Sequence, residues 1–175
     1  MPVRPLTGYK ERSLRSVALR ADPASREIRE AIVDLFDTLA TQRGVALAAP
    51  QIGIPCRLFV WNLKRPRDPG GPPVRGVLIN PEIRERTGSV PVVEGCLSFP
   101  GLDLSIRRPE RVTVFGQNEK GEPVLYTGSG LFARMVEHEV DHLEGILLPD
   151  RQPPLSRLLS LGRRILWERR MKEHP

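Results

Sequence analysis

The sequence is poor in cysteine. Only two cysteines, Cys56 and Cys96, occur in 175 residues, too few for the disulfide framework that stabilises many small secreted domains. Each is therefore expected to be a buried thiol, a metal ligand or a nucleophile. Cys56 lies in the apolar run CRLFVWN, which favours a buried, inert side chain. Cys96 lies between Gly95 and Leu97, in a different kind of segment.

Long apolar runs are also absent. No stretch approaches the roughly 20 residues of a membrane-spanning helix, and the N-terminal segment MPVRPLTGYKERSLRS lacks the apolar region of a secretory signal. We therefore expect a cytoplasmic protein with no membrane partner. Aromatic residues make up only 5% of the chain, so its core must consist mainly of aliphatic side chains. The length suits one domain spanning residues 1–175.

Positive charge is concentrated near the C-terminus. The formal net charge is +6, and residues 151–175 contain seven Arg or Lys but two acidic residues. We expect this stretch to be a basic helix or tail on a nearly neutral body. Such a segment indicates either a polyanionic partner or a solvated helix face.

Hydrophobic spacing predicts three helices. The first begins at Asp22-Pro23, repeats apolar residues every three or four positions, and ends near Gly44. The second begins at Ser129 or Gly130 and ends at Gly145. A third begins at Leu155, after a proline-containing break.

Between the first two helices the period changes to that of strands. Short runs rich in Val, Leu and aromatics are bounded by Gly, Pro or Asn, and we predict strands at 56–62, 74–80, 89–95, 111–118 and 123–127. The turn at 118–121 suggests an antiparallel hairpin. Helix, strands and helices in this order predict a single α+β domain, in which antiparallel strands pack around a central metal-binding helix, with further helices at both ends.

The segment EHEVDH carries the clearest chemical signal. His138 and His142 are four residues apart, which on a helix places both imidazoles on one face, aimed at one point. Two such side chains can bind one metal ion, and Glu139 between them can reach a water at that metal and move its proton. The alternative is an amphipathic helix that carries two histidines by chance. Because the chain has only three histidines, we favour the metal site.

A catalytic metal of this kind needs a third protein ligand and one open position. No further histidine is well placed, and Cys96 is the best remaining candidate, since a thiolate is a strong ligand in a reducing compartment. From composition alone, a buried inert thiol is equally plausible for this residue.

Three motifs, in this order along the chain, resemble those of the peptide deformylase family. The segment GVALAAPQ at 44–51 is similar to GxGLAAxQ, EGCLS at 94–98 is identical to the family motif, and HEVDHLEG at 138–145 matches HExDHLxG. The resemblance implies a hydrolase that removes formyl groups from N-formyl-methionyl nascent peptides. It implies Cys96, His138 and His142 as ligands of Fe(II), with Zn(II), Ni(II) or Co(II) as replacements.

The resemblance also implies roles for other residues. The Gln51 amide and the Leu97 N–H would stabilise the oxyanion, and backbone groups around Ala46 and Gly101 would hold the peptide as an added strand. Three more residues, Glu94, Asp141 and Arg108, would support the site. Glu94 would orient a ligand histidine, and an ion pair between Asp141 and Arg108 would anchor the helix.

Two positions depart from the family pattern. Ala46 replaces a glycine, so a methyl group could narrow the cleft, and Glu137 replaces the usual glutamine, which adds negative charge near the site. Glu137 also lies four residues before Asp141, a repulsive spacing unless an arginine intervenes. These departures suggest, as an alternative, a paralogue with altered specificity.

Two competing hypotheses assign the histidine helix to a different class of protein. A zinc peptidase that acts on ordinary peptides would use HExxH but would leave EGCLS unexplained. A non-catalytic ribosome-binding relative would keep the metal as a structural element but would have no need for Glu139. The resemblance to some family members also suggests that the basic final helix docks on ribosomal RNA, and the opposing interpretation is a solvated helix packed through its leucines.

Overall fold

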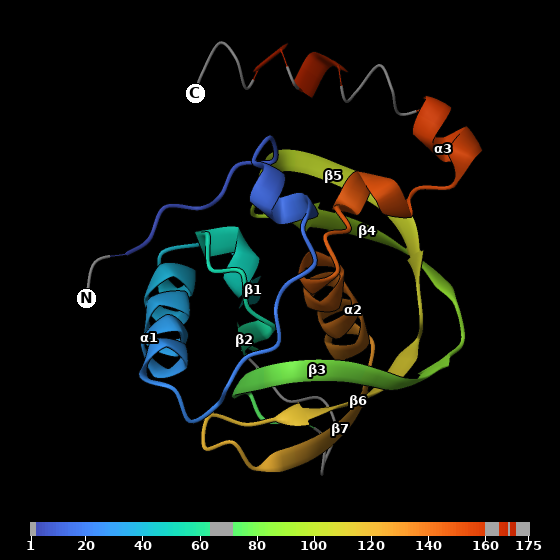
Figure 1. The fold of residues 1–175 in the computed structure, drawn as a ribbon. Helices are drawn as coiled ribbons and strands as arrows, with labels where there is room; N and C mark the ends of the chain where they lie inside the picture. Colours follow the sequence, from blue (N-terminus) through green and yellow to red (C-terminus); the bar gives the residue numbers. More distant parts are fainter. Residues whose placement is uncertain (1–2, 64–71, 160–164, 168, 171–175) are drawn as a thin grey trace.

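The fold is organised around one central helix. The computed structural model describes residues 3–63, 72–159, 165–167, 169 and 170. In Figure 1 helix α2 (Leu131–Leu143) lies in the middle of the molecule, with the strands around it. The other elements are η1 (Arg12–Arg15), α1 (Arg26–Ala40), β1 (Ala46–Ala48), η2 (Ala49–Ile52), β2 (Leu58–Asn62), β3 (Arg75–Thr87), β4 (Val90–Cys96), β5 (Phe99–Arg108), β6 (Arg111–Gln117), β7 (Pro123–Ser129), η3 (Leu148–Arg151) and α3 (Pro154–Leu159).

The strands form two antiparallel sheets. Five strands pair in the order β1-β2-β3-β6-β7, and β4 pairs with β5 in a separate two-stranded sheet. This arrangement confirms the predicted α+β fold, in which the strands surround the helix that carries the two histidines.

Strand β2 shows why a helix lies on each face of the larger sheet. Successive side chains of a strand point to opposite faces. Phe59 and Trp61 pack in the hydrophobic cluster on the α2 side, whereas Leu58 and Val60 pack in the cluster on the α1 side. All four side chains are fully buried, so a nearly continuous apolar run is what this two-sided strand requires.

A third hydrophobic cluster supports the smaller sheet. Inward-facing side chains of β5, among them Leu104 and Ile106, pack there with Cys96, Leu14 and Trp167. The cluster therefore joins the end of β4, where Cys96 lies, to segments from both ends of the chain.

The predicted bounds of the first helix were wrong. Helix α1 is capped by Ser25, whose hydroxyl accepts a hydrogen bond from the Ile28 amide, while Asp22 caps a preceding turn through the Ala24 amide. The helix ends at Thr41 in right-handed conformation, not at Gly44. The start and end predicted for α2 are confirmed, because Gly130 is its N-cap and Gly145 follows it with φ +69°.

The strand predictions were incomplete. They missed β1 and β5, and they ended β3 at residue 80. Strand β3 continues past Pro81 because a register shift between Ile79 and Glu82 accommodates the proline, and Asn80 adopts a positive φ of 52° there.

The C-terminal prediction is tested only in part. Within the described residues, α3 covers Pro154–Leu159 and residues 165–167 are again helical; residues 160–164 and 171–175 lie outside the described part of the chain. No helix among the described residues is long and apolar enough to cross a membrane.

Candidate metal centre

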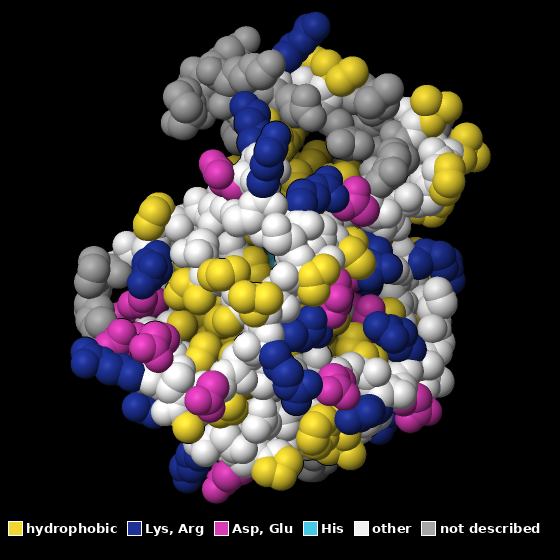
Figure 2. Space-filling model, viewed as in Figure 1, with side chains coloured by type: hydrophobic (Ala, Val, Ile, Leu, Met, Phe, Trp, Pro, Cys, Tyr) yellow, Lys and Arg dark blue, Asp and Glu magenta, His cyan; other side chains and the backbone are white. Residues whose placement is uncertain are grey.

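Helix α2 brings His138 and His142 together. They lie one turn apart, and their ring centroids are separated by 5.0 Å. His142 is buried, and His138 retains a little exposure. In Figure 2 a small area of histidine surface is visible near the centre of the molecule, between hydrophobic side chains.

Cys96 reaches the same point from the end of β4. The Cys96 Sγ lies 3.3 Å from Nε2 of His142, and one donor atom from each of Cys96, His138 and His142 lies within 4.8 Å of the others. One sulfur and two imidazole nitrogens at this spacing fit a divalent transition metal that keeps one coordination position open. Within the described residues, this is the group whose donor atoms converge in this way.

Protonation of the two histidines differs. Burial, and then the charges of His138 and Arg108, hold the pKa of His142 well below its usual range. Burial also lowers the pKa of His138, but hydrogen bonds to Cys96 and Glu94 outweigh it and raise that pKa well above its usual range. Binding of a metal at His138 would therefore compete with its protonation.

Glu139 is the buried acid next to this cluster. Its side chain is 3% exposed, and Oε2 has no hydrogen-bond partner among the described residues. Burial raises the pKa of Glu139 to about 7, although the nearby charge of His138 opposes the shift. A carboxyl group with a pKa of about 7 and a free oxygen in this position can accept or donate a proton at neutral pH.

A buried ion-pair network contacts His138, one of the three candidate metal ligands. Arg108 donates two hydrogen bonds to Glu94, at 3.0 and 3.1 Å, and one to Asp141 at 2.7 Å. Glu94 Oε2 in turn lies 3.0 Å from Nδ1 of His138, so the network fixes the ring whose other nitrogen faces Cys96. The carboxylate of Asp141 also contacts Arg151. In metal sites, a carboxylate that contacts the second ring nitrogen commonly orients a histidine ligand, and Glu94 makes such a contact with His138.

Gln51 lies beside the sulfur of Cys96. It is 2% exposed, and its Nε2 is 3.7 Å from Cys96 Sγ and 3.3 Å from Ser98 Oγ. Its Oε1 accepts a hydrogen bond from the Ala48 amide, which orients the amide donors toward the site. The neighbouring Leu97 is partly exposed.

The Gly44 and Leu97 segments meet in the structure. A Cβ on Gly44 would lie 2.9 Å from the end of the Leu97 side chain. The motif at 44–51 and the motif at 94–98 therefore form one surface beside Cys96.

The two predicted substrate contacts lie in different surroundings. Gly101 is exposed at the start of β5 with φ +76°. Ala46 is 7% exposed and its side chain belongs to the hydrophobic cluster around Trp61 and Phe132. Its methyl group is thus packed in the core, which argues against the expectation that it narrows a cleft.

Glu137 has a partner that the sequence did not identify. Its Oε1 accepts a hydrogen bond of 2.7 Å from Arg86 on β3, so an arginine does intervene in the predicted repulsion with Asp141. Arg86 and Arg151 had no signal in the sequence, because their contacts depend on strand register and on the path of the chain after α2.

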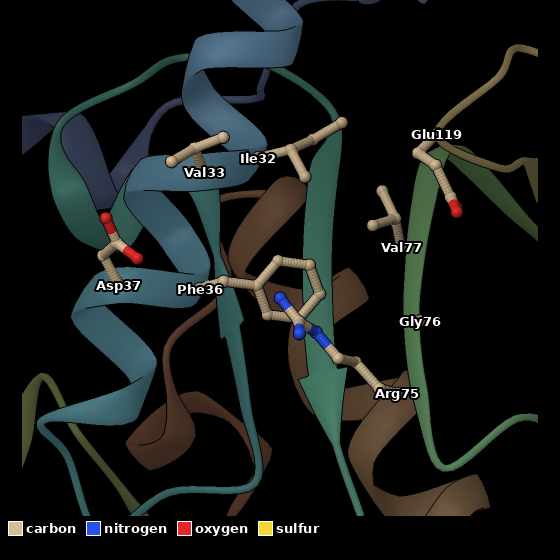
Figure 3. A pocket seen from close by; sticks show the side chains of 8 residues that line it. All are labelled: Ile32, Val33, Phe36, Asp37, Arg75, Gly76, Val77 and Glu119. Carbon is tan, nitrogen blue, oxygen red and sulfur yellow. The ribbon is translucent and has the colours of Figure 1, made fainter. Parts of the chain in front are cut away.

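A hollow elsewhere on the molecule contains none of these residues. It lies between α1 and β3 and has a volume of about 360 Å³. Figure 3 shows Phe36 and Arg75 facing each other in it, with the guanidinium 3.9 Å from the ring centroid. Its lining has no histidine or cysteine, so the metal centre on α2 is the candidate active site.

The family model for polypeptide deformylase matches residues 3–158. The chain belongs to the polypeptide deformylase family. The peptide deformylase of Aquifex aeolicus (strain VF5) is 41% identical over 159 residues, which cover 91% of this chain and 93% of the relative. That of Acidothermus cellulolyticus is 40% identical over 92% of this chain and 85% of the relative.

Solved structures agree with this assignment. A peptide deformylase from Legionella pneumophila is 34% identical, with a TM-score of 0.84 over 99% of this chain and 100% of that one. One from Synechococcus elongatus, in complex with actinonin, is 36% identical, with a TM-score of 0.81 over 93% of this chain and 86% of that one. The prediction of a peptide deformylase is confirmed.

Proposed function

We propose that this protein removes the formyl group from the N-terminal formyl-methionine of newly made polypeptides and releases formate. The observation that carries the proposal is the buried carboxylate of Glu139, whose Oε2 has no hydrogen-bond partner among the described residues, next to the converging donors of Cys96, His138 and His142. A site that only stabilised the fold would have no need for such an acid, which argues against a non-catalytic relative.

Cys96, His138 and His142 are the residues that would hold the metal. Fe(II) is the ion we propose, on the family resemblance; Zn(II), Ni(II) or Co(II) are possible replacements, since the donor set suits several of these ions. When bound, the metal would lower the pKa of a coordinated water toward 7 and polarise the formyl carbonyl.

The remaining steps belong to residues of the chain. Glu139 takes a proton from the attacking water at Oε2 and later delivers it to the leaving amine. The Gln51 Nε2–H, oriented by the bond from Ala48 to its Oε1, and the Leu97 N–H donate to the oxyanion of the tetrahedral intermediate. Ala46, through its backbone, and Gly101 hold the peptide as an added strand.

The direct test is formate release from a formyl-methionyl peptide. Protein prepared anaerobically with Fe(II) is compared with protein loaded with Zn(II), each with its metal content measured. We expect turnover in both, and faster turnover with iron. A fully metal-loaded protein that releases no formate from any formyl-methionyl peptide would contradict the proposal.

A second proposal concerns the basic C-terminal segment, which we infer docks on ribosomal RNA. Arg169 and Arg170 are exposed and would contact phosphates. Replacing both with Glu should weaken ribosome binding at low salt, whereas the same change at exposed Arg26 and Lys120 should have little effect. Equal ribosome affinities of the two double variants would contradict the docking proposal and favour a helix that is only solvated.

A further inference from the structure

An aromatic cluster joins both chain ends to the start of β5. Trp167, near the C-terminus, is 8% exposed, and its ring centroid lies 4.7 Å from that of Tyr9 and 5.6 Å from that of Phe99. Tyr9 and Phe99 also contact each other at 5.5 Å. In Figure 1 the short red helical piece at residues 165–167 lies above β5. The three rings therefore hold Phe99 between two segments that are distant in sequence.

Phe99 lies at the end of the turn between β4 and β5. Cys96 and Phe99 are paired across the two strands, so Leu97 and Ser98 form a two-residue connection between them. Cys96, Phe99 and Trp167 belong to the same hydrophobic cluster. A shift of the Phe99 ring would therefore move the turn that carries Cys96 Sγ and the Leu97 N–H.

Trp167 also makes one directed contact. Its Nε1–H donates a 2.7 Å hydrogen bond to the carbonyl oxygen of Pro100. The peptide group is planar, so fixing that carbonyl also fixes the direction of the N–H of Gly101, which belongs to the same group. The position needs such an anchor, because glycine with φ +76° has wide conformational freedom, and Gly101 falls between the regular register pairs of β4 and β5.

We infer that Trp167 is a positioning residue for peptide binding: it holds the Pro100–Gly101 peptide group in the orientation that receives the substrate backbone. The inference rests on the proposed function, in which Gly101 contacts the peptide. Trp167 touches no reacting atom. Its effect should therefore appear mainly in KM, and it should grow with substrate length, because longer peptides use more of the added strand.

Trp167→Phe tests the hydrogen bond, because phenylalanine keeps an aromatic ring in the cluster and lacks the donor. We expect KM for a formyl-methionyl tripeptide to rise about 2- to 10-fold, the range of one net hydrogen bond, with a smaller rise for formyl-methionyl dipeptides and little change in kcat. Tyr9→Phe is the matched control, since its hydroxyl has no hydrogen-bond partner among the described residues. Leu166→Ala, at an exposed neighbour, is the second control, and both controls should leave KM unchanged.

Amide hydrogen exchange of the unliganded, metal-loaded protein gives a readout independent of turnover. Exchange at Gly101 should be faster in Trp167→Phe than in the wild type or in Tyr9→Phe. An unchanged tripeptide KM in Trp167→Phe would overturn the inference, and so would a rise that is the same for all peptide lengths. If the wild-type protein released no formate, the proposed function would fail. Hydrogen exchange would then be the only test of whether Trp167 orders Gly101, and equal exchange rates in Trp167→Phe and the wild type would overturn that role.

Discussion

The thiols of Cys56 and Cys96 lie in very different surroundings. Cys96 faces histidines and Gln51, whereas Cys56 packs with aliphatic side chains on the α1 side of the sheet. Burial raises the pKa of Cys56 from 9.0 to about 11, because a thiolate there would lose its hydration. The predicted buried, inert role of Cys56 is consistent with this environment.

We predict that Cys56 resists alkylation. At pH 9 a thiol with the ordinary pKa of 9.0 is half ionised, but Cys56 with a pKa of about 11 is about 1% ionised, so its reaction with iodoacetamide should be about 50-fold slower or more. Peptide mapping by mass spectrometry on native and urea-unfolded protein measures this difference. Rapid labelling of Cys56 in the native protein would contradict it. The raised pKa also affects stability. As the pH rises from about 9 to 11, the thiol of Cys56 ionises in the unfolded chain before it ionises in the folded protein. Ionisation therefore favours the unfolded chain, and the free energy of unfolding should fall over this range.

Gly145 is required by both its conformation and its surroundings. It has φ +69°, and an added Cβ would lie 2.5 Å from the carbonyl oxygen of Arg15. We predict that Gly145→Ala lowers the free energy of unfolding by about 3 kcal/mol, from left-handed strain of 1–2 kcal/mol plus the backbone clash. Gly121→Ala is the control: φ is +81°, but the nearest atom, on Pro23, lies at 3.3 Å. Urea unfolding that shows equal losses for both variants would contradict the clash.

Some residue contacts could be predicted from the sequence and others could not. The convergence of His138 and His142 follows from the helix period, which is a local property. The end of α2 at Gly145 also follows from a local rule. Arg86 and Trp167 gave no such signal, because their partners, Glu137 and Pro100, are brought to them by the register of strands and by the path of distant segments.

Among the elements, β3 and α2 are joined by a partly buried ion pair. The side chain of Glu137 is 6% exposed and that of Arg86 is 54% exposed. A buried carboxylate without its partner is costly, although the exposure of Arg86 limits the gain from the pair. This contact provides a physical reason why the chain tolerates an acid immediately before His138.

We predict that Arg86→Ala destabilises the protein by about 1 kcal/mol, and that the loss largely disappears in a Glu137→Gln background, where no buried charge is left without its partner. Arg84→Ala is the matched control, because Arg84 pairs with half-exposed Glu82 and should have little effect. Chemical denaturation of the four members of the cycle measures the coupling. Additive losses would mean that Arg86 does not neutralise Glu137.

The elements that the sequence failed to predict share a physical cause. Strand β1 has only three residues, Ala46–Ala48, too few for a periodic pattern. Strand β5 begins with Phe-Pro-Gly, which is typical of a turn, although Leu102, Leu104 and Ile106 alternate inward along it. Strand β3 crosses Pro81 through a register shift. In each case pairing with a neighbouring strand, not the local sequence pattern, determines the strand.

At the scale of the whole molecule, α2 carries both core residues and the residues proposed to act in catalysis. The helix contributes to the main hydrophobic cluster through Met135 and Val136. It also carries Glu139, together with His138 and His142, which contact Glu94 and Cys96 of β4. Mutations that unfold the protein and mutations that disable its chemistry can therefore lie on adjacent residues, and metal content must be measured alongside activity to separate them.

The central claim is that Glu139 moves the proton in a metal-dependent deformylation, and Glu139→Gln tests it most directly. The variant should keep its metal, because Cys96, His138 and His142 are unchanged, but it should release formate from a formyl-methionyl peptide about 10² to 10⁴-fold more slowly. Glu144→Gln, at the partly exposed end of the same helix, should behave like the wild type. A fully metal-loaded Glu139→Gln protein with wild-type turnover would contradict the account.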